Sequence, residues 1–591
     1  MIVKMKKLTL LVRAVDRNDA VARLRELGVV HVHPVAAPQS EDVARLEGEL
    51  AEVGRALSIV GSEAPEQPAE APEPAQLVAH ILERARQREQ LIRELEELRE
   101  QHRWFERWGR VSLAAVKELE RAGVILRFYV GERQAVRAFP PEKSIQVIRE
   151  EQRTLYFVYF ATSADDRLDF KEDPMPAVEV DALEAQMAEV ESAIAALEQE
   201  LAGLARHRQA LVRHSEQLTK RLEFSRVLAG MGQAEEIAFL QGYCPADEVQ
   251  RVTAAADREG WAYTVADPDN PDEVPTLIRN PRWLRIVEPV FKFLGTVPGY
   301  QEHDISFWFL LFFSVFFAIL IGDAGYGLLF LGATWLGRRK LRRAPREPFV
   351  LMYVLSFATI IWGAMSGNWF GVAQIGQLPL LRRLIVEPVN AFALDNQNFM
   401  MYLCFVIGAL HLTVAHAMNA FRLMNSLRAL AQLGWIAIVW GLFFTAGRLV
   451  LGKSGPSSTV ILALVGGGTA LVLLFANAQR KFLKGVLQSL AETPLSVISS
   501  FSDVVSYLRL FAVGFASVTV ESSFNEMALG LGFSSVLRGL IAAFILFFGH
   551  ALNIVLGFMA VIVHGVRLNM LEFSGHLGMQ WSGRPYQPFR E

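Results

Sequence analysis

The chain has 591 residues, of which 52% are hydrophobic, and its formal net charge is −3. This length exceeds that of one domain, and the composition excludes a protein that is soluble throughout. Charged residues crowd the part before about residue 280, whereas long runs almost free of charge dominate from Ile305 onward. The only cysteines, Cys244 and Cys404, lie one in each part, so we expect no disulfide framework and no cysteine-based metal site.

The N-terminal part begins with a small β-α-β pattern. The first residues carry scattered charges and no apolar core of signal-peptide length, so we expect the N-terminus to remain in the cytoplasm. Residues 7–12 predict a strand, residues 18–27 a helix capped by Asn18 and stopped by Gly28, and residues 29–35 a second strand.

Two charged helices with heptad repeats follow. The first spans residues 76–108, after a helix at 41–57 and a Pro/Glu/Ala-rich connection at 62–75 that we expect to be flexible. The second runs without a break from Asp181 to about residue 230, a length of about 75 Å. Their apolar positions, spaced four and three apart, are Leu91, Leu95, Leu98, His102 and Phe105 in the first helix and Leu183, Met187, Val190, Ile194, Leu197, Leu201 and Leu204 in the second.

A second α/β patch lies between these helices, with candidate strands at 124–130, 144–149 and 155–161. Because both helices belong to one chain, we favour an intramolecular antiparallel coiled-coil hairpin that carries this lobe, at about residues 110–175, at its far tip. An intermolecular coiled-coil dimer is the alternative. Residues 236–265 then return to complete the first lobe.

The soluble part shows no pattern that predicts catalysis. His31 and His33 lie on a predicted strand without nearby acidic or cysteine ligands, so the sequence predicts no metal site and no cofactor there. We therefore interpret residues 1–280 as multidomain, with cytoplasmic α/β lobes joined by the coiled-coil hairpin.

Residues 281–591 predict an all-α membrane domain. The first apolar block is split near residues 322–325 into a tight helical hairpin, because a basic cluster at residues 338–346 and the N-terminal part should both be cytoplasmic. This division gives about eight transmembrane helices and places the basic junctions at 422–428 and 480–484, and the C-terminus, on the cytoplasmic side. The apolar blocks are 305–337, 348–375, 399–421, 430–451, 457–476, 496–529 and 534–571.

The last two blocks are longer than a span requires, so we expect them to be strongly tilted, and each carries an arginine. A cationic side chain at the centre of a membrane helix costs about 2.5 to 3.5 kcal/mol on insertion scales, so we interpret Arg509 and Arg567 as functional. His564 lies one helical turn before Arg567, with Asn553 and His550 further back along the same face. A stripe of small residues, which allows close helix approach, flanks Arg509: Ser502, Ser506, Ala512, Ala516 and Thr519.

One motif in the membrane part is misleading. Residues 447–454, GRLVLGKS, match the G-x-x-x-x-G-K-S pattern of a phosphate-binding loop. That motif needs a buried strand before it and a helix that opens at the lysine, whereas this segment ends a membrane helix and runs into Gly455 and Pro456. We interpret it as an interfacial turn.

Four segments carry a resemblance to a known family: SYLRLFAVGFA at residues 506–516, HGVRLNMLEF at 564–573, GDAGYG at 322–327 and PYQPF at 585–589. With the layout of the two parts, they make the chain resemble the membrane stator subunit of V-type and A-type rotary ATPases, called subunit I in prokaryotes and subunit a in eukaryotes. The soluble part matches that family by layout more than by motif.

The resemblance implies a non-catalytic subunit of an H⁺- or Na⁺-translocating complex in the prokaryotic plasma membrane. Its implied partners are the rotor ring subunits of the c or K type, peripheral stalk subunits of the E or G type, the ATP-hydrolysing head with its central stalk, and membrane lipids, with no nucleic acid. In the family, two arginines face the ring, and by position these are Arg509 and Arg567. A fixed guanidinium favours the charged form of a ring carboxylate, so the carboxylate releases its ion there.

Polar residues on the same helices are candidates for lining the two half-channels, although each could instead satisfy helix contacts. Eukaryotic members carry a glutamate where this chain has Gly557 and a histidine where it has Ser517, so the resemblance does not assign one half-channel residue by residue. The sequence leaves open whether the ion is H⁺ or Na⁺ and whether the complex makes or consumes ATP. The candidates are Ser506, Asp503, Glu521, Glu526, His550, Asn553, His564 and Glu572.

Two other functions compete with the stator subunit. A stand-alone secondary ion transporter with a regulatory coiled-coil domain predicts internal repeats with paired broken helices, and no second half resembles the first. A coiled-coil membrane receptor would not need two arginines in its membrane helices. We therefore favour the stator subunit.

Overall fold

The computed structural model describes residues 1–61, 72–137, 144–151, 153–163, 165–453, 455–477, 482–532 and 535–591. These residues form two compact units, one of residues 1–10, 27–32 and 242–590 and the other of residues 11–26, 33–241 and 591. Most of the predicted Pro/Glu/Ala-rich connection, Ser454 of the GRLVLGKS segment and the start of the basic junction at 480–484 lie outside the described residues.

The first lobe is built on a sheet whose main strands lie in the order β2-β8-β1-β9, with the short β7 paired to β8. β1 and β2 are therefore not neighbours, and the order is that of a split β-α-β fold with residues 34–236 inserted between its second and third strands. The prediction of Asn18 as a helix cap is wrong, because a 3₁₀ turn at Ala14–Asp16 leads directly into the helix. The elements are β1 (Met5–Arg13), α1 (Arg17–Leu27), β2 (His31–His33), β7 (Gly232–Ala234), β8 (Ile237–Pro245), α8 (Val249–Glu259) and β9 (Ala262–Ala266).

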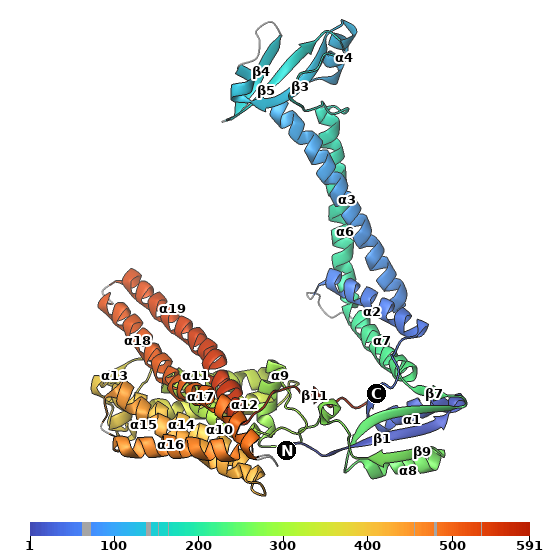
Figure 1. The fold of residues 1–591 in the computed structure, drawn as a ribbon. Helices are drawn as coiled ribbons and strands as arrows, with labels where there is room; N and C mark the ends of the chain where they lie inside the picture. The colour runs from blue at the N-terminus through green and yellow to red at the C-terminus, as the bar shows by residue number, and fades with distance from the viewer. Residues whose placement is uncertain are drawn as a thin grey trace. The chain divides into compact units, whose positions relative to one another are not determined.

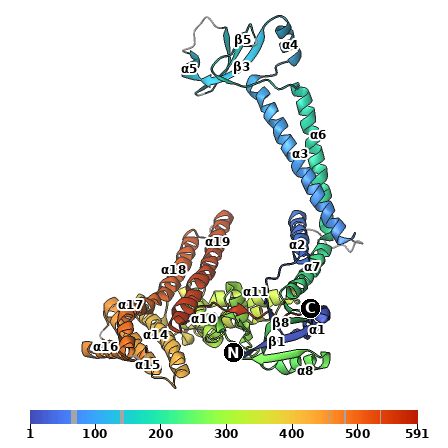
Figure 2. The same ribbon diagram turned by 45° about the vertical axis from the view of Figure 1, so that its right-hand side comes forward.

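A long helical hairpin dominates the second unit, where α3 and α6 lie side by side in both views (Figures 1 and 2). The two helices are antiparallel, because Arg84 Nε lies 3.1 Å from Glu200 Oε1 and Arg99 Nη2 lies 2.8 Å from Glu191 Oε1. The helices of this unit are α2 (Glu41–Val60), α3 (Pro74–Trp108), α6 (Val180–Leu204) and α7 (Arg208–Ala229).

The predicted unbroken helix from Asp181 to residue 230 is wrong. A 3₁₀ turn at Ala205–His207 separates α6 from α7, and the two helices pack on different partners, α6 on α3 and α7 on α2. The His207 side chain is buried at this turn and its Nε2 accepts a hydrogen bond from Arg206 Nε. The heptad spacing continues across the break, so the sequence alone did not reveal the change of partner.

The distal lobe is a four-stranded sheet at the tip of α3 and α6 (Figure 1). Its strand order is β4-β5-β3-β6, and neighbouring strands are antiparallel. Trp104 and Trp108 of α3 pack edge-on against Phe128 of β3, which attaches the sheet to the helix. The elements are α4 (Leu113–Arg121), β3 (Ile125–Glu132), α5 (Arg133–Arg137), β4 (Ile145–Glu151), β5 (Thr154–Ala161) and β6 (Lys171–Glu172).

The C-terminal part is helical. Six helical stretches among the described residues are long and apolar enough to cross a membrane, and α10 and α11 pass the same test only as a pair bent by 118°. The bend occurs at Gly322, whose φ is +69°, and Asp323, whose side chain caps α11. The helices are α9 (Glu288–Leu294), α10 (Ser306–Ile321), α11 (Ala324–Lys340), α12 (Glu347–Ser366), α13 (Ala373–Gly376), α14 (Gln397–Arg422), α15 (Arg428–Leu451), α16 (Ser458–Phe475), α17 (Phe482–Ser506), α18 (Leu508–Gly530) and α19 (Val536–Ala560).

The last span continues beyond α19 as two π-helical segments, Val561–Gly565 and Leu568–Phe573, and ends in the short α20 (Ser574–His576). A C-terminal strand, β11 (Arg584–Pro585), pairs in parallel with β10 (Pro275–Thr276), which precedes the membrane part in the chain. The C-terminal tail therefore returns to the sequence that introduces the first span.

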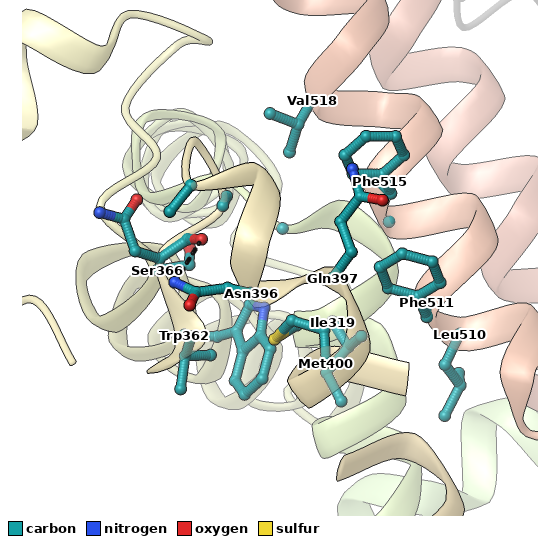
Figure 3. A pocket seen from close by; sticks show the side chains of 16 residues that line it. Ile319, Trp362, Ser366, Asn396, Gln397, Met400, Leu510, Phe511, Phe515 and Val518 are labelled. Carbon is teal, nitrogen blue, oxygen red and sulfur yellow. Dashed lines mark hydrogen bonds between the residues drawn. The ribbon is translucent and has the colours of Figure 1, made fainter. Parts of the chain in front are cut away.

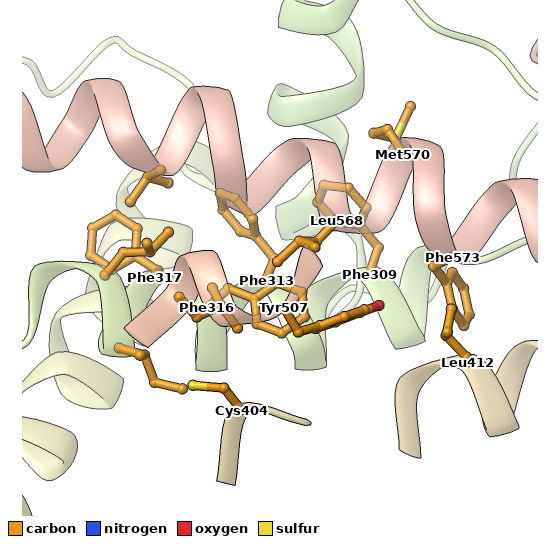
Figure 4. Packing of buried hydrophobic residues seen from close by; sticks show 14 of the residues in the cluster. Phe309, Phe313, Phe316, Phe317, Cys404, Leu412, Tyr507, Leu568, Met570 and Phe573 are labelled. Carbon is orange, nitrogen blue, oxygen red and sulfur yellow. The ribbon is translucent and has the colours of Figure 1, made fainter. Parts of the chain in front are cut away.

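The core of the membrane part is built around α10 (Figure 4). Four phenylalanines of this helix are buried, and the core also contains Tyr507, Leu568 and Phe573 from the last two spans. Because α10 packs on α12, α18 and α19, it supports both helices that carry the arginines. The four phenylalanines are Phe309, Phe313, Phe316 and Phe317.

Candidate functional site

Two arginines and one glutamate meet on the last two long spans. Arg509 Nη2 lies 2.7 Å from Glu572 Oε1, and Arg567 Nε lies 3.5 Å from the same oxygen. The Glu572 side chain is 5% exposed, whereas those of Arg509 and Arg567 are 26% and 53% exposed. One buried carboxylate therefore serves two more accessible guanidinium groups, and the cluster keeps one net positive charge when all three are ionised.

A break in the helix positions Arg509. The sequence placed Arg509 in the middle of one continuous helix, but α17 ends one residue before Tyr507 and α18 begins one residue after it. Tyr507 is buried and its hydroxyl lies 2.8 Å from His411 Nδ1. Leu510 N–H donates to the Tyr507 carbonyl, and Arg509 Nε donates to the Ser506 carbonyl at 3.0 Å. The buried tyrosine thus tightens the chain locally, and the guanidinium is held by the carbonyl at the break.

The two π segments position Arg567 and Glu572. In an α-helix, residues five apart differ by about 140° around the axis, so these two side chains would point in different directions. A π turn instead brings residues i and i+5 together, which agrees with the 3.5 Å contact. The π segments also shift the helical phase, so His550 and Asn553 do not join Arg567 in one cluster as α-helical spacing predicted.

Asn553 belongs to a second, buried polar cluster around Glu521. Asn553 Nδ2 donates to Glu521 Oε1 at 2.7 Å and to Ser517 Oγ at 2.9 Å. Asn368 Nδ2 donates to Glu521 Oε2 at 3.1 Å. Each oxygen of this buried carboxyl group therefore accepts from an amide.

Asp323 completes the second cluster. It is fully buried, caps α11 by accepting from Tyr326 N–H at 2.8 Å, and accepts from Gly371 N–H at 3.3 Å. Asn368 Nδ2 donates both to the Gly322 carbonyl at 3.2 Å and to Glu521 Oε2 at 3.1 Å, so it links the bend at Asp323 to the Glu521 carboxyl group.

His550 lies at the edge of the second cluster. Its Nδ1 is 2.7 Å from the Tyr326 hydroxyl, and its Nε2 is 3.2 Å from Asn525 Oδ1. Both ring nitrogens are therefore engaged, which fixes the ring between α11 and α18.

A cavity of about 490 Å³ lies beside the arginine cluster. Arg567 and Glu572 line it from the last span, and Asp503 and three serines line it from α17. His416 and His576 form part of its wall, and their rings are hydrogen-bonded at 2.9 Å. The cavity is therefore a polar space next to the Arg567 guanidinium group and the Glu572 carboxyl group. The three serines are Ser496, Ser499 and Ser500.

This cavity lies toward the face of the membrane part that joins the rest of its unit. His303, just before α10, places Nε2 3.0 Å from Asn419 Oδ1 near the end of α14, and Asn419 Nδ2 donates to the carbonyl of His576. Burial, reinforced by Arg422, lowers the pKa of His303, so its ring is neutral near neutral pH. The start of α10 and the ends of α14 and the last span thus share one face.

The Glu521 cluster lies toward the opposite face. It gathers the end of α10, the turn after α12 and the second half of α18, where Ser522 Oγ donates to the Gly371 carbonyl at 3.2 Å. Along α18, Arg509 and Glu521 are twelve residues apart, or about 18 Å. The two polar clusters are therefore separated along the same helix.

The stretch of α18 between the two clusters is packed with apolar side chains. Leu510, Phe511, Phe515 and Val518 line a space of only about 40 Å³, together with Trp362 and other residues (Figure 3). On its inner face, α18 also approaches α10 so closely that a Cβ at Gly514 would lie 2.6 Å from the Ile319 carbonyl oxygen. No room for a wide aqueous path remains at this face of the helix.

The remaining sequence-predicted residues lie outside these contacts. Ser506 donates its hydroxyl to the Asp503 carbonyl, so it serves the helix backbone. The His564 ring is partly buried, and its Nδ1 is buried without a hydrogen-bond partner. Glu526 is exposed on α18.

Comparison with known proteins assigns the chain to a family. It is 31% identical over 614 aligned positions to "V-type ATP synthase subunit I" of Borreliella burgdorferi and 32% identical over 631 positions to "V-type ATP synthase subunit I 1" of Treponema pallidum, and both alignments cover 100% of each chain. The chain belongs to the subunit I family of V-type ATP synthases.

A more distant relative of subunit I and one solved structure also match parts of the chain. "A-type ATP synthase subunit I" of Methanocaldococcus jannaschii is 23% identical over 61% of this chain and 56% of its own length. A solved structure, titled as the cytoplasmic N-terminal domain of subunit I of V-ATPase, is 18% identical with a TM-score of 0.24, covering 44% of this chain and 99% of its own. No family model matches the chain.

Sequence reasoning on subunit I missed several site residues. His416 and His576 lie far apart in the chain and outside the two apolar blocks that carry the arginines. Asp323 lies in the GDAGYG motif, to which the sequence assigned no role. Asn368 lies in a turn and carried no motif. Their common signal is a polar side chain flanked by apolar residues, which is the pattern expected of intramembrane polar groups.

The described part of this subunit I chain shows no group of three or more His, Cys, Asp or Glu side chains arranged to hold a metal ion. In the GRLVLGKS segment, Gly452 has a φ of +60° and ends α15, and Lys453 Nζ lies 3.9 Å from the Tyr402 ring centroid. The described residues of this segment follow a helix, whereas a phosphate-binding loop follows a strand.

Proposed function

We propose that this chain is the non-catalytic membrane stator subunit of a rotary V/A-type ATPase. In this role it forms two ion half-channels against a rotor ring, and Arg509 and Arg567 promote ion release from ring carboxylates. The observation that carries the proposal is the accessible arginine pair held by buried Glu572, about 18 Å along α18 from the second, buried polar cluster around Glu521.

The outer surface of the last two spans supports a ring-facing role. Ser502, Ala512, Ala516 and Thr519, the small residues on the stripe of Arg509, are exposed, so within this chain they do not mediate close helix contact. A surface of small side chains that includes the Arg509 guanidinium group suits a partner that rotates past it. On the last span, the exposed Arg567 continues a stripe of exposed apolar residues: Phe544, Phe547, Phe548, Val555, Met559 and Val563.

The arginine cluster would act electrostatically on the ring. A ring carboxylate that arrives opposite Arg509 or Arg567 meets a positive charge, and its ionised form is favoured there. Glu572 offsets one of the two charges, so an arriving carboxylate meets one net positive charge. The packed apolar stretch of α18 after Arg509 would separate the half-channels and prevent a direct leak.

The membrane topology and the binding partners that we propose follow from the same role. We propose eight membrane crossings, with α10 and α11 as two short ones of about 24 and 26 Å, and with residues 1–280 and the C-terminus in the cytoplasm. The lobes and the coiled-coil hairpin of residues 1–280 would bind the peripheral stalks, and residues 281–591 would meet the rotor ring in the plasma membrane.

The proposal is tested by Arg509→Ala in the assembled complex. ATP-driven ion uptake into vesicles is measured with and without Na⁺, and we expect uptake to be lost while the complex assembles, because ring carboxylates no longer meet a fixed charge. Arg343→Ala, in the exposed loop between α11 and α12, is the matched control and should pump normally. Normal uptake by Arg509→Ala would refute the proposed role of the arginine.

A further inference from the structure

Four polar side chains from four helices form a hydrogen-bonded chain beside the arginine cluster. Gln432 Oε1 of α15 lies 2.8 Å from His416 Nδ1 of α14, and His416 Nε2 lies 2.9 Å from His576 Nδ1 of α20. His576 Nε2 lies 3.1 Å from Asp503 Oδ2 of α17. These contacts join residues far apart in sequence: His416 and His576 are 160 residues apart, and Asp503 and His576 are 73 apart.

With the Gln432 amide oxygen toward His416, hydrogen-bond counting predicts one extra proton in this hydrogen-bonded network. With its oxygen toward His416, Gln432 accepts, so His416 Nδ1 carries a hydrogen and a neutral His416 can only accept at Nε2. His576 must then donate at Nδ1 to His416. If Asp503 is ionised, His576 must also donate at Nε2, and the ring is an imidazolium paired with a carboxylate.

The hydrogen-bonded network of these four side chains has a second arrangement with one proton fewer. If the Gln432 amide turns so that its NH₂ group donates to His416, then His416 donates to His576 and a neutral His576 donates to Asp503. Every contact is satisfied in both arrangements. The network can therefore gain or lose one proton by rotating an amide and shifting hydrogens, without moving a helix.

His576 and Asp503 line the cavity beside Arg567 and Glu572. The side chains of His576 and Asp503 are 9% and 29% exposed, and both line the cavity of about 490 Å³. The charged and titratable groups around His576 are Asp503 of α17, His416 of α14, and Arg567 and Glu572 across the cavity. His416 and His576 both line this cavity, which Arg567 also lines.

We propose that His576 and Asp503 form a proton-binding pair that exchanges protons between the cavity and the ion pathway at the arginines, so that the translocated ion is H⁺. In the transfer, the Gln432 amide turns, the His416 Nδ1–H bond breaks and its proton passes to cavity water, while the His576 Nδ1–H bond breaks and an N–H bond forms at His416 Nε2. The His576 ring becomes neutral and keeps its Nε2–H bond to Asp503, which is the second arrangement. This inference rests on the proposed stator function and names the ion that it moves.

A Na⁺ ion fits this arrangement poorly. Hard cations bind oxygen ligands, and Asp503 Oδ2 is already occupied by a ring N–H. An imidazolium at His576 would also repel a second cation. The described residues of the chain therefore suit proton exchange at this place.

The test measures ATP-driven proton uptake and ATP hydrolysis by the full complex in vesicles, at several pH values from about 5 to about 8. We expect His576→Gln to lower the protons taken up per ATP at least about tenfold and to change the shape of the pH profile. In His576→Ala, added imidazole should restore part of the uptake, which a purely structural role would not allow. His214→Gln, on α7, is the matched control.

The outcomes separate this inference from the proposed function. Wild-type uptake with an unchanged pH profile in both His576→Gln and Asp503→Asn would overturn the proton-binding pair, as would ATP-driven Na⁺ uptake that equals proton uptake. If His576→Gln does not assemble, Asp503→Asn decides, and Asp503→Glu should restore uptake. If Arg509→Ala abolishes uptake and both pair variants pump normally, the stator function stands and only the pair is refuted.

Discussion

At the residue scale, two glutamates of α18 show how burial changes the role of the same side chain. Glu521 is 1% exposed and accepts hydrogen bonds from Asn368 and Asn553, whereas Glu526, five residues later, is exposed. Both are apparent in the sequence as acidic residues in an apolar helix. Only the packing of α10, α12 and α19 around α18 distinguishes them.

We expect Glu521→Gln to destabilise the subunit by about 1–3 kcal/mol, because one amide hydrogen-bond donor would face the NH₂ of Asn368 or Asn553 and leave it without an acceptor. Thermal unfolding of the detergent-solubilised complex measures the loss, and vesicle uptake should fall with it. Glu526→Gln is the matched control on the same helix. Equal unfolding temperatures for the two variants would show that the buried cluster does not hold the helices together.

At the element scale, close backbone contact fixes the bend between α10 and α11. Gly363 of α12 packs against this bend, where a Cβ would lie 2.1 Å from the Ala324 nitrogen and 2.7 Å from the Asp323 carbonyl carbon. The bend also presents Asp323 to Glu521, so the packing of α12 supports the second polar cluster. In the last span, the π segments also position functional side chains, because they bring Arg567 and Glu572 together.

We expect Gly363→Ala to cost at least about 1–3 kcal/mol, since the added methyl group meets backbone that cannot move aside cheaply. Gly332→Ala in α11, where a Cβ meets nothing within 4 Å, should be neutral or slightly stabilising. The yield of assembled complex and its thermal unfolding temperature compare the two variants. A Gly363→Ala subunit as stable as Gly332→Ala would mean that the bend tolerates a wider separation from α12.

At the scale of the whole molecule, the C-terminal tail connects the end of the last span to earlier parts of its unit. Tyr586 N–H donates to the Thr276 carbonyl, and Phe589 N–H donates to the Val30 carbonyl at 2.9 Å. The Tyr586 hydroxyl donates to the Val29 carbonyl, and the Phe589 side chain is buried. The tail therefore ties residues near both ends of the sequence together.

We expect Phe589→Ala to loosen this tail, because a buried aromatic anchor is removed while the hydrogen bonds alone are too weak to hold it. Hydrogen exchange should become faster at the amides of Tyr586 and Phe589. Arg590→Ala, which changes an exposed neighbour, should leave their exchange unchanged. Slow exchange in Phe589→Ala would show that the backbone pairing holds the tail without the anchor.

The sequence by itself determined the division into a charged α/β part and an apolar helical part, and it led to the predictions of a coiled-coil hairpin and of Arg509 and Arg567 as site residues. These features follow from local properties, since hydropathy, helical period and a charge in an apolar run can be read without knowing the fold.

Tertiary structure alone decided which residues meet. Heptad spacing did not reveal the turn at Ala205–His207, because each half of the helix keeps its period while it changes partner. The break at Tyr507 and the π segments around Arg567 arise from buried side-chain packing, which α-helical spacing cannot anticipate. The network of His416 and His576 joins residues far apart in the chain, and such contacts exist only once the helices have packed.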